Sequence, residues 1–238
     1  MSGVWVVIPT YNEAEVVEDL VRAVHRELSA ADGEFRILVV DDGSPDGTGA
    51  IVERLGGELP EVEALHRTAK DGLGRAYIAG FARALAAGAE IVAQMDADFS
   101  HAPADLPRLL AAVRGGADMA VGSRYVAGGG VEDWGPVRRA ISRGGCTYAR
   151  IALGVPIRDL TGGFKAHRRT TLEAIQLDAV RSQGYAFQIE ITYRAVRRGL
   201  RVVELPIVFR DRRLGHSKMS ARIAIEAMFL VPGLRRRR

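Results

Sequence analysis

The 238-residue chain is 47% hydrophobic and 26% charged, a composition that fits one large globular domain and excludes wholesale disorder and collagen-like repeats. Its only cysteine, Cys146, excludes a disulfide framework and a cysteine-rich zinc site, and it favours a reducing compartment. The net charge of +4 is uneven: residues 1–120 hold 10 basic and 20 acidic side chains, and residues 121–238 hold 23 and 9. The basic half suggests an anionic partner, although a codon bias toward arginine explains it equally well.

The first 122 residues alternate strand and helix patterns. Short apolar runs predict five strands, at 4–8, 37–40, 62–65, 91–95 and 119–121. Apolar residues at helical spacing predict the intervening helices, at 13–28, 46–55, 73–87 and 103–113. Repeated strand–helix–strand units form a parallel sheet with helices on both faces, and ligands bind beyond the carboxyl ends of its strands. We therefore expect the site in the polar segments that follow the strands, at 9–13, 41–46, 67–74, 96–100 and 122–125.

The pattern changes after residue 122. The sequence predicts a flexible loop, three helices, a strand, a basic loop, a closing helix and a basic tail, at 127–130, 137–152, 169–177, 187–198, 202–208, 210–217, 221–230 and 235–238. No linker is long enough to separate two domains. The apolar start lacks the basic region of a signal peptide, and the apolar run 223–234 is shorter than the roughly 20 residues of a membrane span. We therefore expect neither a signal peptide nor a transmembrane helix.

Two carboxylates in Asp96-Ala97-Asp98 directly follow the predicted strand 91–95. Carboxylates so placed can face one hard cation, and Mg²⁺ or Mn²⁺ is held in this way together with substrate phosphates. Ser100 and His101 come next and are candidates to lie near the metal. The alternatives are that the acidic pair only forms a loop and that His101 only caps the following helix.

Two further strand ends carry polar motifs. Asp42, in Asp41-Asp42-Gly43-Ser44, could accept hydrogen bonds from a ribose or a base, or the segment could form an ordinary turn, and the two roles are compatible. Lys70 and the glycines that follow it open a predicted helix and suit a phosphate. The spacing matches neither the Walker nor the Rossmann motif, so neither nucleotide-binding fold is supported.

Arginines and a lysine gather in the second half of the sequence. Arg124 follows the fifth predicted strand, a predicted helix carries three more arginines, and the late loop carries four further basic residues: Arg138, Arg139, Arg143, Arg210, Arg212, Arg213 and Lys218. Converging guanidinium groups would form an oxyanion cage, since they bind phosphate in bidentate fashion. The alternative is a solvated basic face. Aromatic residues are 6% and are not interleaved with the basic ones, which argues against nucleic acid.

These motifs together resemble a known family. Three of them resemble family 2 glycosyltransferases of the GT-A fold: Val7-Ile8-Pro9-Thr10-Tyr11-Asn12-Glu13, Val39-Val40-Asp41-Asp42-Gly43-Ser44 and Asp96-Ala97-Asp98. Five others resemble, more specifically, polyprenyl-phosphate (dolichyl-phosphate) mannose synthases: Gly122-Ser123-Arg124-Tyr125, Ile141-Ser142-Arg143-Gly144, Asp159-Leu160-Thr161-Gly162-Gly163-Phe164, Tyr185-Ala186-Phe187-Gln188 and Asp211-Arg212-Arg213-Leu214-Gly215-His216-Ser217-Lys218. The similarity runs from residue 4 to about residue 220.

The resemblance implies a single α/β domain of the GT-A type, with a mostly parallel twisted sheet, flanking helices and C-terminal acceptor-binding helices. Residues 1–122 would bind the nucleotide-sugar, 123–218 the acceptor, and 219–238 would form a membrane-docking helix and basic tail. The donor nucleotide would be held by Pro9, Tyr11, Glu13, Val40, Asp42 and Lys70, and its diphosphate by Asp96, Ala97 and Asp98. The metal would be held by Asp96, Asp98 and Ser100, where some relatives have a glutamine in place of the serine. The lipid phosphate and donor diphosphate would be held by Arg124, Arg138, Ser142, Arg212 and Lys218.

The implied reaction is mannose transfer from GDP-mannose to a polyprenyl monophosphate, with inversion and with Asp98, Arg124 and Arg212 as catalytic residues. The acceptor phosphate is the nucleophile, and its second pKa near 6 makes it mostly dianionic at pH 7, so no catalytic base is needed. Alternatives are glucose transfer from UDP-glucose and a non-catalytic binding module. A processive polysaccharide synthase is disfavoured, because the sequence lacks membrane spans and a Gln-x-x-Arg-Trp motif.

A polyprenyl acceptor implies work at the cytoplasmic face of a membrane. The predicted helix 221–230 and the tail 235–238 would dock there peripherally, or an integral-membrane partner protein would hold the chain. The alternative is that the helix packs on the core and the tail is solvated.

Overall fold

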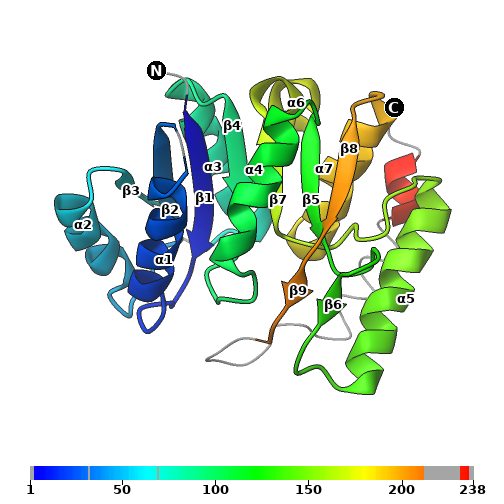
Figure 1. Ribbon diagram of the computed structural model, residues 1–238, viewed down its shortest axis with the longest axis horizontal. Coiled ribbons are helices and arrows are strands. Elements are labelled where there is room, and N and C mark those ends of the chain that lie inside the picture. The colour runs from blue at the N-terminus through cyan, green and yellow to red at the C-terminus, as the bar shows by residue number, and fades with distance from the viewer. Residues whose placement is uncertain (1–2, 32, 69, 212–230, 236–238) are drawn as a thin grey trace.

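The computed structural model describes residues 3–31, 33–68, 70–211 and 231–235. A seven-stranded sheet runs through its centre in the order β3-β2-β1-β4-β7-β5-β8 (Figure 1). Its strands are β1 (Val4–Thr10), β2 (Phe35–Asp41), β3 (Val62–His66), β4 (Ile91–Gln94), β5 (Met119–Ser123), β7 (Lys165–Arg168) and β8 (Val202–Pro206). The five strands expected in the first half are therefore confirmed. The sheet joins them to two strands from the second half.

One strand departs from the expected parallel arrangement. β7 lies between β4 and β5 and pairs antiparallel with both, whereas the other neighbouring strands of the sheet pair in parallel. The expectation of a mostly parallel sheet is therefore confirmed, and β7 is the antiparallel member that the sequence did not single out. The segment Lys165–Arg168 carries three basic side chains and lacks an apolar run, so its sequence gives no strand signal.

Helices cover both faces of the sheet, as expected (Figure 1). On one face α1 (Val17–Ser29), α2 (Thr48–Glu58) and α4 (Leu106–Arg114) pack into one apolar core. On the other face α3 (Leu73–Ala86), α6 (Arg169–Ala174) and α7 (Gly184–Arg197) pack into a second. Short 3₁₀ turns precede α4 and follow α6, at Pro103–Asp105 and Leu177–Ala179. Each helix buries the apolar stripe that its sequence spacing predicts.

Two predicted boundaries differ from those in the structure. Helix α1 begins at Val17 rather than at residue 13, and a turn at residues 13–16 precedes it. The main-chain N–H groups of Glu13 and Ala14 donate to the side chains of Thr48 and Asp46, which ties this turn to the start of α2. The strand predicted over 202–208 is two strands, because β9 (Val208–Phe209) leaves the main sheet. It pairs with β6 (Gly130–Val131), within what was expected to be a loop.

Helix α5 (Pro136–Leu153) stands at one end of the molecule, beside β6 (Figure 1). Ala149 and Leu153 on its inner side pack with Ile189 and Tyr193 of α7 in a third, smaller cluster. The predicted helix 221–230 and most of the basic loop fall outside the described residues. Over the parts of the chain that are described, no helix has the length and apolar character to cross a membrane.

Candidate active site

The carboxyl ends of the parallel strands lie along one edge of the sheet, toward the bottom of Figure 1. The polar segments expected to form the site leave the strands at this edge, after β1, β2, β3, β4 and β5. They converge because β3, β2, β1 and β4 pair in parallel, and β5 runs in the same direction as β4 since both pair antiparallel with β7.

The loops after β1 and β2 are tied together. The main-chain N–H of Asn12 donates to the hydroxyl of Ser44 at 2.9 Å, and Ser44 in turn is held by the carboxylate of Asp41. Above them, the Lys70 ammonium lies 3.9 Å from the centre of the Tyr11 ring. Tyr11 and Lys70, both expected to bind the donor, thus come together from two different strand ends, and a lysine on an aromatic face is a favourable pairing.

Asp42 forms an ion pair that the sequence did not predict. Its carboxylate is 6% exposed and accepts a hydrogen bond from the Arg67 guanidinium at 2.5 Å. Burial raises the pKa of Asp42 above its ordinary value, and Arg67 opposes that rise. Arg67 follows β3 in a segment already expected at the site, so its position was the signal available. Of the other two donor residues at the strand ends, Pro9 and Val40 sit side by side in β1 and β2, and the Val40 side chain belongs to the core.

The two carboxylates of Asp96 and Asp98 lie just past β4. Asp98 is buried and accepts the main-chain N–H of Ser100 at 3.1 Å. Asp96 is partly exposed and accepts the hydroxyl of Tyr77 at 3.1 Å. Burial, reinforced by the Asp96 charge, raises the pKa of Tyr77, so this hydroxyl stays protonated and remains a donor.

A glycine allows the close approach around Asp96. A methyl group on Gly163 would lie 3.0 Å from an Asp96 carboxylate oxygen, so only glycine fits there without displacement. The Gln94 amide holds this turn by donating to the Gly163 carbonyl at 2.9 Å. Tyr77, Gln94 and Gly163 were not expected at the site, although Gly163 stands in one of the motifs that carried the family resemblance.

The donor set at this point fits a hard divalent cation. The Ser100 hydroxyl is buried and finds no hydrogen-bond partner among the described residues, and it lies two residues beyond Asp98. Nowhere in the described part of the chain do three or more His, Cys, Asp or Glu side chains form a metal-binding group. Two carboxylates and one unpartnered hydroxyl suit Mg²⁺ or Mn²⁺, which completes its shell with water and phosphate oxygens.

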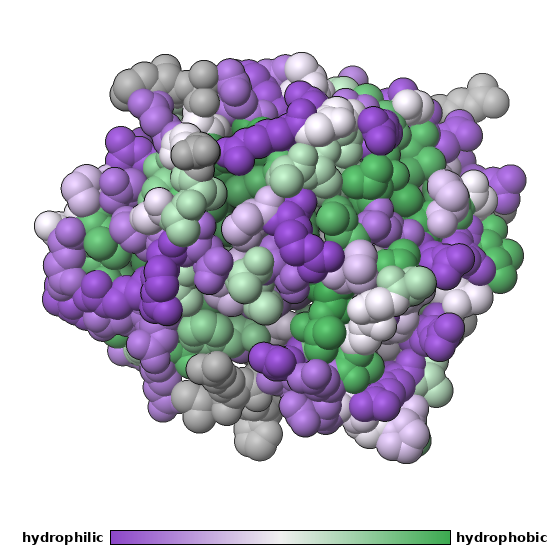
Figure 2. Space-filling model, viewed as in Figure 1, coloured by the Kyte–Doolittle hydropathy of each residue, from purple (hydrophilic) through white to green (hydrophobic). Residues whose placement is uncertain are grey.

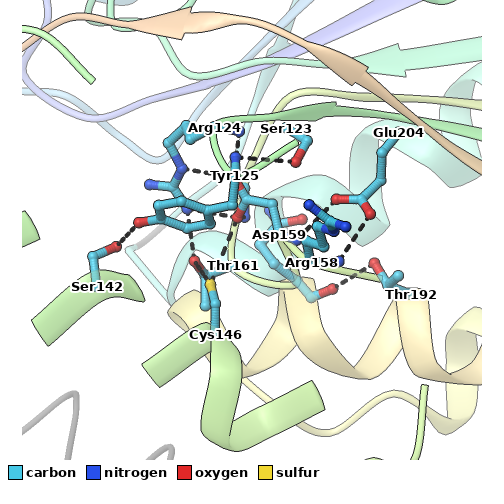
Figure 3. Close-up of polar contacts among 12 residues, drawn as sticks. Ser123, Arg124, Tyr125, Ser142, Cys146, Arg158, Asp159, Thr161, Thr192 and Glu204 are labelled. Carbon is cyan, nitrogen blue, oxygen red and sulfur yellow. Dashed lines mark hydrogen bonds and ion pairs between the residues drawn. The ribbon is translucent and has the colours of Figure 1, made fainter. Parts of the chain in front are cut away.

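Arg124 lies at the centre of a buried polar cluster (Figure 3). Its Nε and Nη2 atoms donate to the two carboxylate oxygens of Asp159, both at 2.7 Å, and Nη2 also donates to the Thr161 hydroxyl at 2.7 Å. Asp159 is fully buried. Burial alone would raise the pKa of Asp159, but Arg124 holds it below its ordinary value. Burial would likewise lower the pKa of Arg124, and Asp159 raises it instead.

The ion pair with Asp159 reduces the positive charge that Arg124 can offer to a phosphate. The expectation was a guanidinium with its charge available to phosphate, yet the charge is compensated by Asp159 and the side chain is 6% exposed. The Nη1 amino group donates to none of the described residues and is the part of Arg124 left for a phosphate oxygen. Asp159 and Thr161 were not expected at the site.

Two aromatic side chains link Arg138 and Ser142 of α5 to Arg124. The Tyr125 hydroxyl donates to Ser142 at 2.7 Å, and the Arg124 guanidinium lies 5.2 Å from the centre of the Tyr125 ring. Trp134 lies between the two arginines, 5.7 Å from Arg124 and 4.2 Å from Arg138. The structure therefore brings Arg124, Arg138 and Ser142 together, as expected. Arg212 and Lys218 lie outside the described residues.

The chain is similar to known glycosyltransferases. The model of the family described as "Glycosyl transferase family 2" matches residues 5–176. The chain is 52% identical over 227 residues to a protein of Mycolicibacterium smegmatis named polyprenol monophosphomannose synthase, covering 95% of this chain and 84% of that protein. It is 51% identical over 222 residues to an undecaprenyl-phosphate mannosyltransferase of Micrococcus luteus, covering 93% and 89% respectively.

Solved structures show the same fold at low identity. Glucosyl-3-phosphoglycerate synthase from Mycobacterium tuberculosis, in complex with Mn²⁺, UDP and glucosyl-3-phosphoglycerate, matches with a TM-score of 0.70 at 19% identity, over 98% of this chain and 80% of that chain. The same enzyme with Mg²⁺ and UDP also matches with a TM-score of 0.70, at 18% identity and with the same coverage. Since the family model covers more than half of the chain, this protein belongs to glycosyl transferase family 2 and has the GT-A fold.

Proposed function

We propose that this glycosyltransferase moves mannose from GDP-mannose to a polyprenyl (dolichyl-type) monophosphate, giving polyprenyl-phosphate mannose and GDP with inversion at the sugar. Two relatives above 50% identity carry names for mannosyl transfer to polyprenyl phosphates. The observation that carries the proposal is the pairing, at one sheet edge, of an oxygen-donor metal site with a cluster of arginine and hydroxyl side chains. A reaction between two phosphate-bearing substrates needs both features.

Each half of the site has a task. Asp96, Asp98 and Ser100 would hold Mg²⁺ or Mn²⁺, which neutralises charge on the leaving diphosphate when bound. Tyr11, Lys70 and the Asp42–Arg67 pair would position the nucleoside and its phosphates. Glu13, Pro9 and the main chain of Val40 would complete that side of the pocket.

The acceptor side needs no base. A phosphate monoester with a pKa near 6 is already mostly dianionic at pH 7 and can attack directly. Arg138, Ser142 and the Nη1 group of Arg124 would hold it in line with the sugar, and positioning of this kind supplies much of the rate enhancement. Arg212 and Lys218, outside the described residues, are proposed to contribute to the same task.

Because a polyprenyl chain resides in a membrane, we place the enzyme at the cytoplasmic face of a membrane, docked peripherally or through an integral-membrane partner. Residues 219–238 remain the proposed docking segment from the sequence. The donor, the acceptor and the membrane are its proposed partners, and nucleic acid is not among them.

The test is label transfer from GDP-mannose to a short-chain polyprenyl phosphate with Mg²⁺ or Mn²⁺, with UDP-glucose run in parallel. We expect label from GDP-mannose only, and a loss of about 10²-fold or more in Asp98→Asn, since the variant removes one charge from the metal site. Label from UDP-glucose only would replace the donor and keep the mechanism. Binding of GDP-mannose without transfer to any acceptor would favour a non-catalytic module.

A further inference from the structure

Helix α5 exposes apolar side chains on its outer face. Val137, Ile141 and Ile151 are 70%, 52% and 70% exposed, and their spacing places them on one stripe. Cys146 and Leu153, on the inner face of α5, are buried. Figure 2 shows apolar and strongly polar side chains side by side at the lower right, where α5 lies in Figure 1. A helix with this distribution is suited to lie in an interface between water and lipid.

A cavity of about 110 Å³ lies on another side of the same helix. It is lined by Tyr125, by Arg143, Thr147 and Arg150 of α5, and by Arg158 of the loop that follows; we call it the arginine pocket. The three α5 residues are spaced by four and three positions, so they form a second stripe beside the apolar one. Tyr125 lies between this pocket and the candidate active site and contacts both: it lines the pocket, and its hydroxyl donates to Ser142. In Figure 3, Arg158 is drawn on the other side of Tyr125 from Ser142.

The arginine pocket carries positive charge that the described residues do not neutralise. The guanidinium groups of Arg143, Arg150 and Arg158 make no hydrogen bond or ion pair with any described residue. The carboxylate beside Arg158 belongs to Glu204, whose oxygens accept the main-chain N–H groups of Arg158 and Asp159 at 2.8 and 2.9 Å. Arg143 and Arg158 are exposed and Arg150 is half-buried, so solvent screens much of their mutual repulsion. A bound oxyanion would accept several charge-assisted hydrogen bonds from them.

We propose that the arginine pocket binds the phosphate of an anionic membrane lipid, while the apolar stripe of α5 enters the lipid interface. A lipid headgroup is favoured over a soluble phosphate because the apolar stripe and the pocket lie on the same helix, and only a lipid surface would contact both at once. In this proposal the lipid phosphate is a second one, beside the acceptor phosphate that Arg124, Arg138 and Ser142 would hold. The proposal rests on the proposed membrane location and adds α5 to the docking segment 219–238, and it does not depend on the donor or on the transfer reaction.

The experiment is flotation of the full chain with phosphatidylcholine vesicles that contain or lack phosphatidylglycerol. We expect Arg150→Gln to weaken binding to phosphatidylglycerol vesicles about tenfold, the effect of losing a charged hydrogen-bonding group. Arg139→Gln is the matched control, because it removes the same charge from an exposed position on α5 outside the pocket. We expect it to lose no more than about fivefold, the general attraction of one basic residue to an anionic surface, and less than Arg150→Gln loses. Ile151→Gln should weaken binding as well, since it interrupts the apolar stripe.

Calorimetry with inorganic phosphate separates the two sources of the anion. One outcome would show that the pocket takes a soluble anion and that the lipid proposal is wrong. In that outcome wild type binds inorganic phosphate and Arg150→Gln does not, while Arg150→Gln and Arg139→Gln both bind vesicles like wild type. Equal losses in Arg150→Gln and Arg139→Gln would also overturn it, because they would show general charge attraction. Transfer to a short-chain acceptor without vesicles should be unchanged in Arg150→Gln, so failure of the transfer reaction in wild type is distinguishable from failure of docking.

Discussion

Three of the charged side chains expected at the site are held by an oppositely charged partner from a distant part of the chain. Asp42 pairs with Arg67, Arg124 with Asp159, and Arg138 with Asp211, over separations of 25, 35 and 73 residues. The sequence could indicate which side chains follow which strand, because that depends on local patterns. It could not indicate their partners, because no local spacing rule relates residues so far apart. The partners matter, since they decide how much of each charge is left for a substrate.

The Arg124–Asp159 pair should be essential for stability as well as for activity. Asp159→Asn leaves a buried guanidinium without its counter-charge, and breaking such a pair costs about 3–5 kcal/mol of the free energy of unfolding. Urea denaturation followed by circular dichroism measures this loss. The double variant Arg124→Met/Asp159→Leu removes both charges but leaves the main-chain N–H groups of Arg124 and Gly162 without their Asp159 acceptor. It should therefore recover part of the stability and none of the transfer activity. Equal stability of Asp159→Asn and wild type would contradict the assignment.

The same pair predicts an acid dependence of stability. The folded-state pKa of Asp159 is lowered, so its contribution is complete above the unfolded value near 3.9 and is lost as the pH falls through the folded value. Wild type should therefore lose stability below about pH 4 more steeply than Asp159→Asn does. Thermal unfolding of both proteins between neutral and acidic pH tests the difference in slope, and parallel curves would rule out the linkage.

Ser100→Ala tests whether the Ser100 hydroxyl is a ligand of the proposed metal ion. Removal of the hydroxyl takes away one oxygen donor but leaves both carboxylates, so we expect weaker metal activation rather than loss of activity. The concentration of Mn²⁺ at half-maximal transfer should rise about tenfold, with the maximal rate changed less. Thr48→Ser, a mild change at a hydroxyl distant from the acidic pair, should leave the Mn²⁺ dependence unaltered. An unchanged dependence in Ser100→Ala would exclude Ser100 from the metal site.

Elements with a strong apolar pattern were predictable, and those formed by tertiary pairing were not. The strands and helices of the first half appear where the spacing predicts them. β7 does not, because its segment Lys165–Arg168 is basic yet buried. The Lys165 ammonium donates to the carbonyl and side-chain oxygens of Gln188 at 3.0 and 2.8 Å, and burial lowers its pKa to about 7. Burial likewise lowers the pKa of His167 to about 3.

Helix α3 packs closely against the sheet at Gly80, where there is no room for a larger side chain. A methyl group on Gly80 would lie 2.4 Å from a Val7 methyl group of β1, which forces displacement of one element or the other. Gly80→Ala should therefore destabilise the protein by about 1–3 kcal/mol in spite of the better helix propensity of alanine. Gly57→Ala in α2 is the control, because nothing lies within 4 Å of the added methyl group, and it should stabilise by up to about 1 kcal/mol. Chemical denaturation of the two variants compares them, and a neutral Gly80→Ala would show that α3 can move.

One sheet runs through the whole molecule, and strands from the donor-binding half and the acceptor-binding half alternate within it. β4 from the first half and β5 are both paired with β7, which comes later in the chain than either. The family, the fold and the edge that holds the site could be predicted from the sequence. The interleaving of the strands could not, because it depends on which segment fills the space between β4 and β5.

Interleaved strands predict that the two halves unfold together. The chain has two tryptophans, Trp5 in β1 and Trp134 beside α5, so each half carries its own fluorescent probe. Variants that retain one tryptophan, Trp5→Phe and Trp134→Phe, should each lose their remaining tryptophan signal at the same denaturant concentration as their own circular dichroism signal. Fluorescence midpoints separated from the circular dichroism midpoint would show that one half unfolds before the other.

The position of β7 in the sequence also determines how long one edge of β4 lacks a partner while the chain is synthesised. β4 is complete at Gln94, but the strand that covers its free edge begins only at Lys165. At a synthesis rate of about 5–20 residues per second, the ribosome needs on the order of several seconds to supply that strand. During this interval the apolar edge of β4 can pair with another chain, since an uncovered edge is a template for association. Slow translation between these two strands should therefore lower the yield of folded protein, whereas a pause after Arg168 should not.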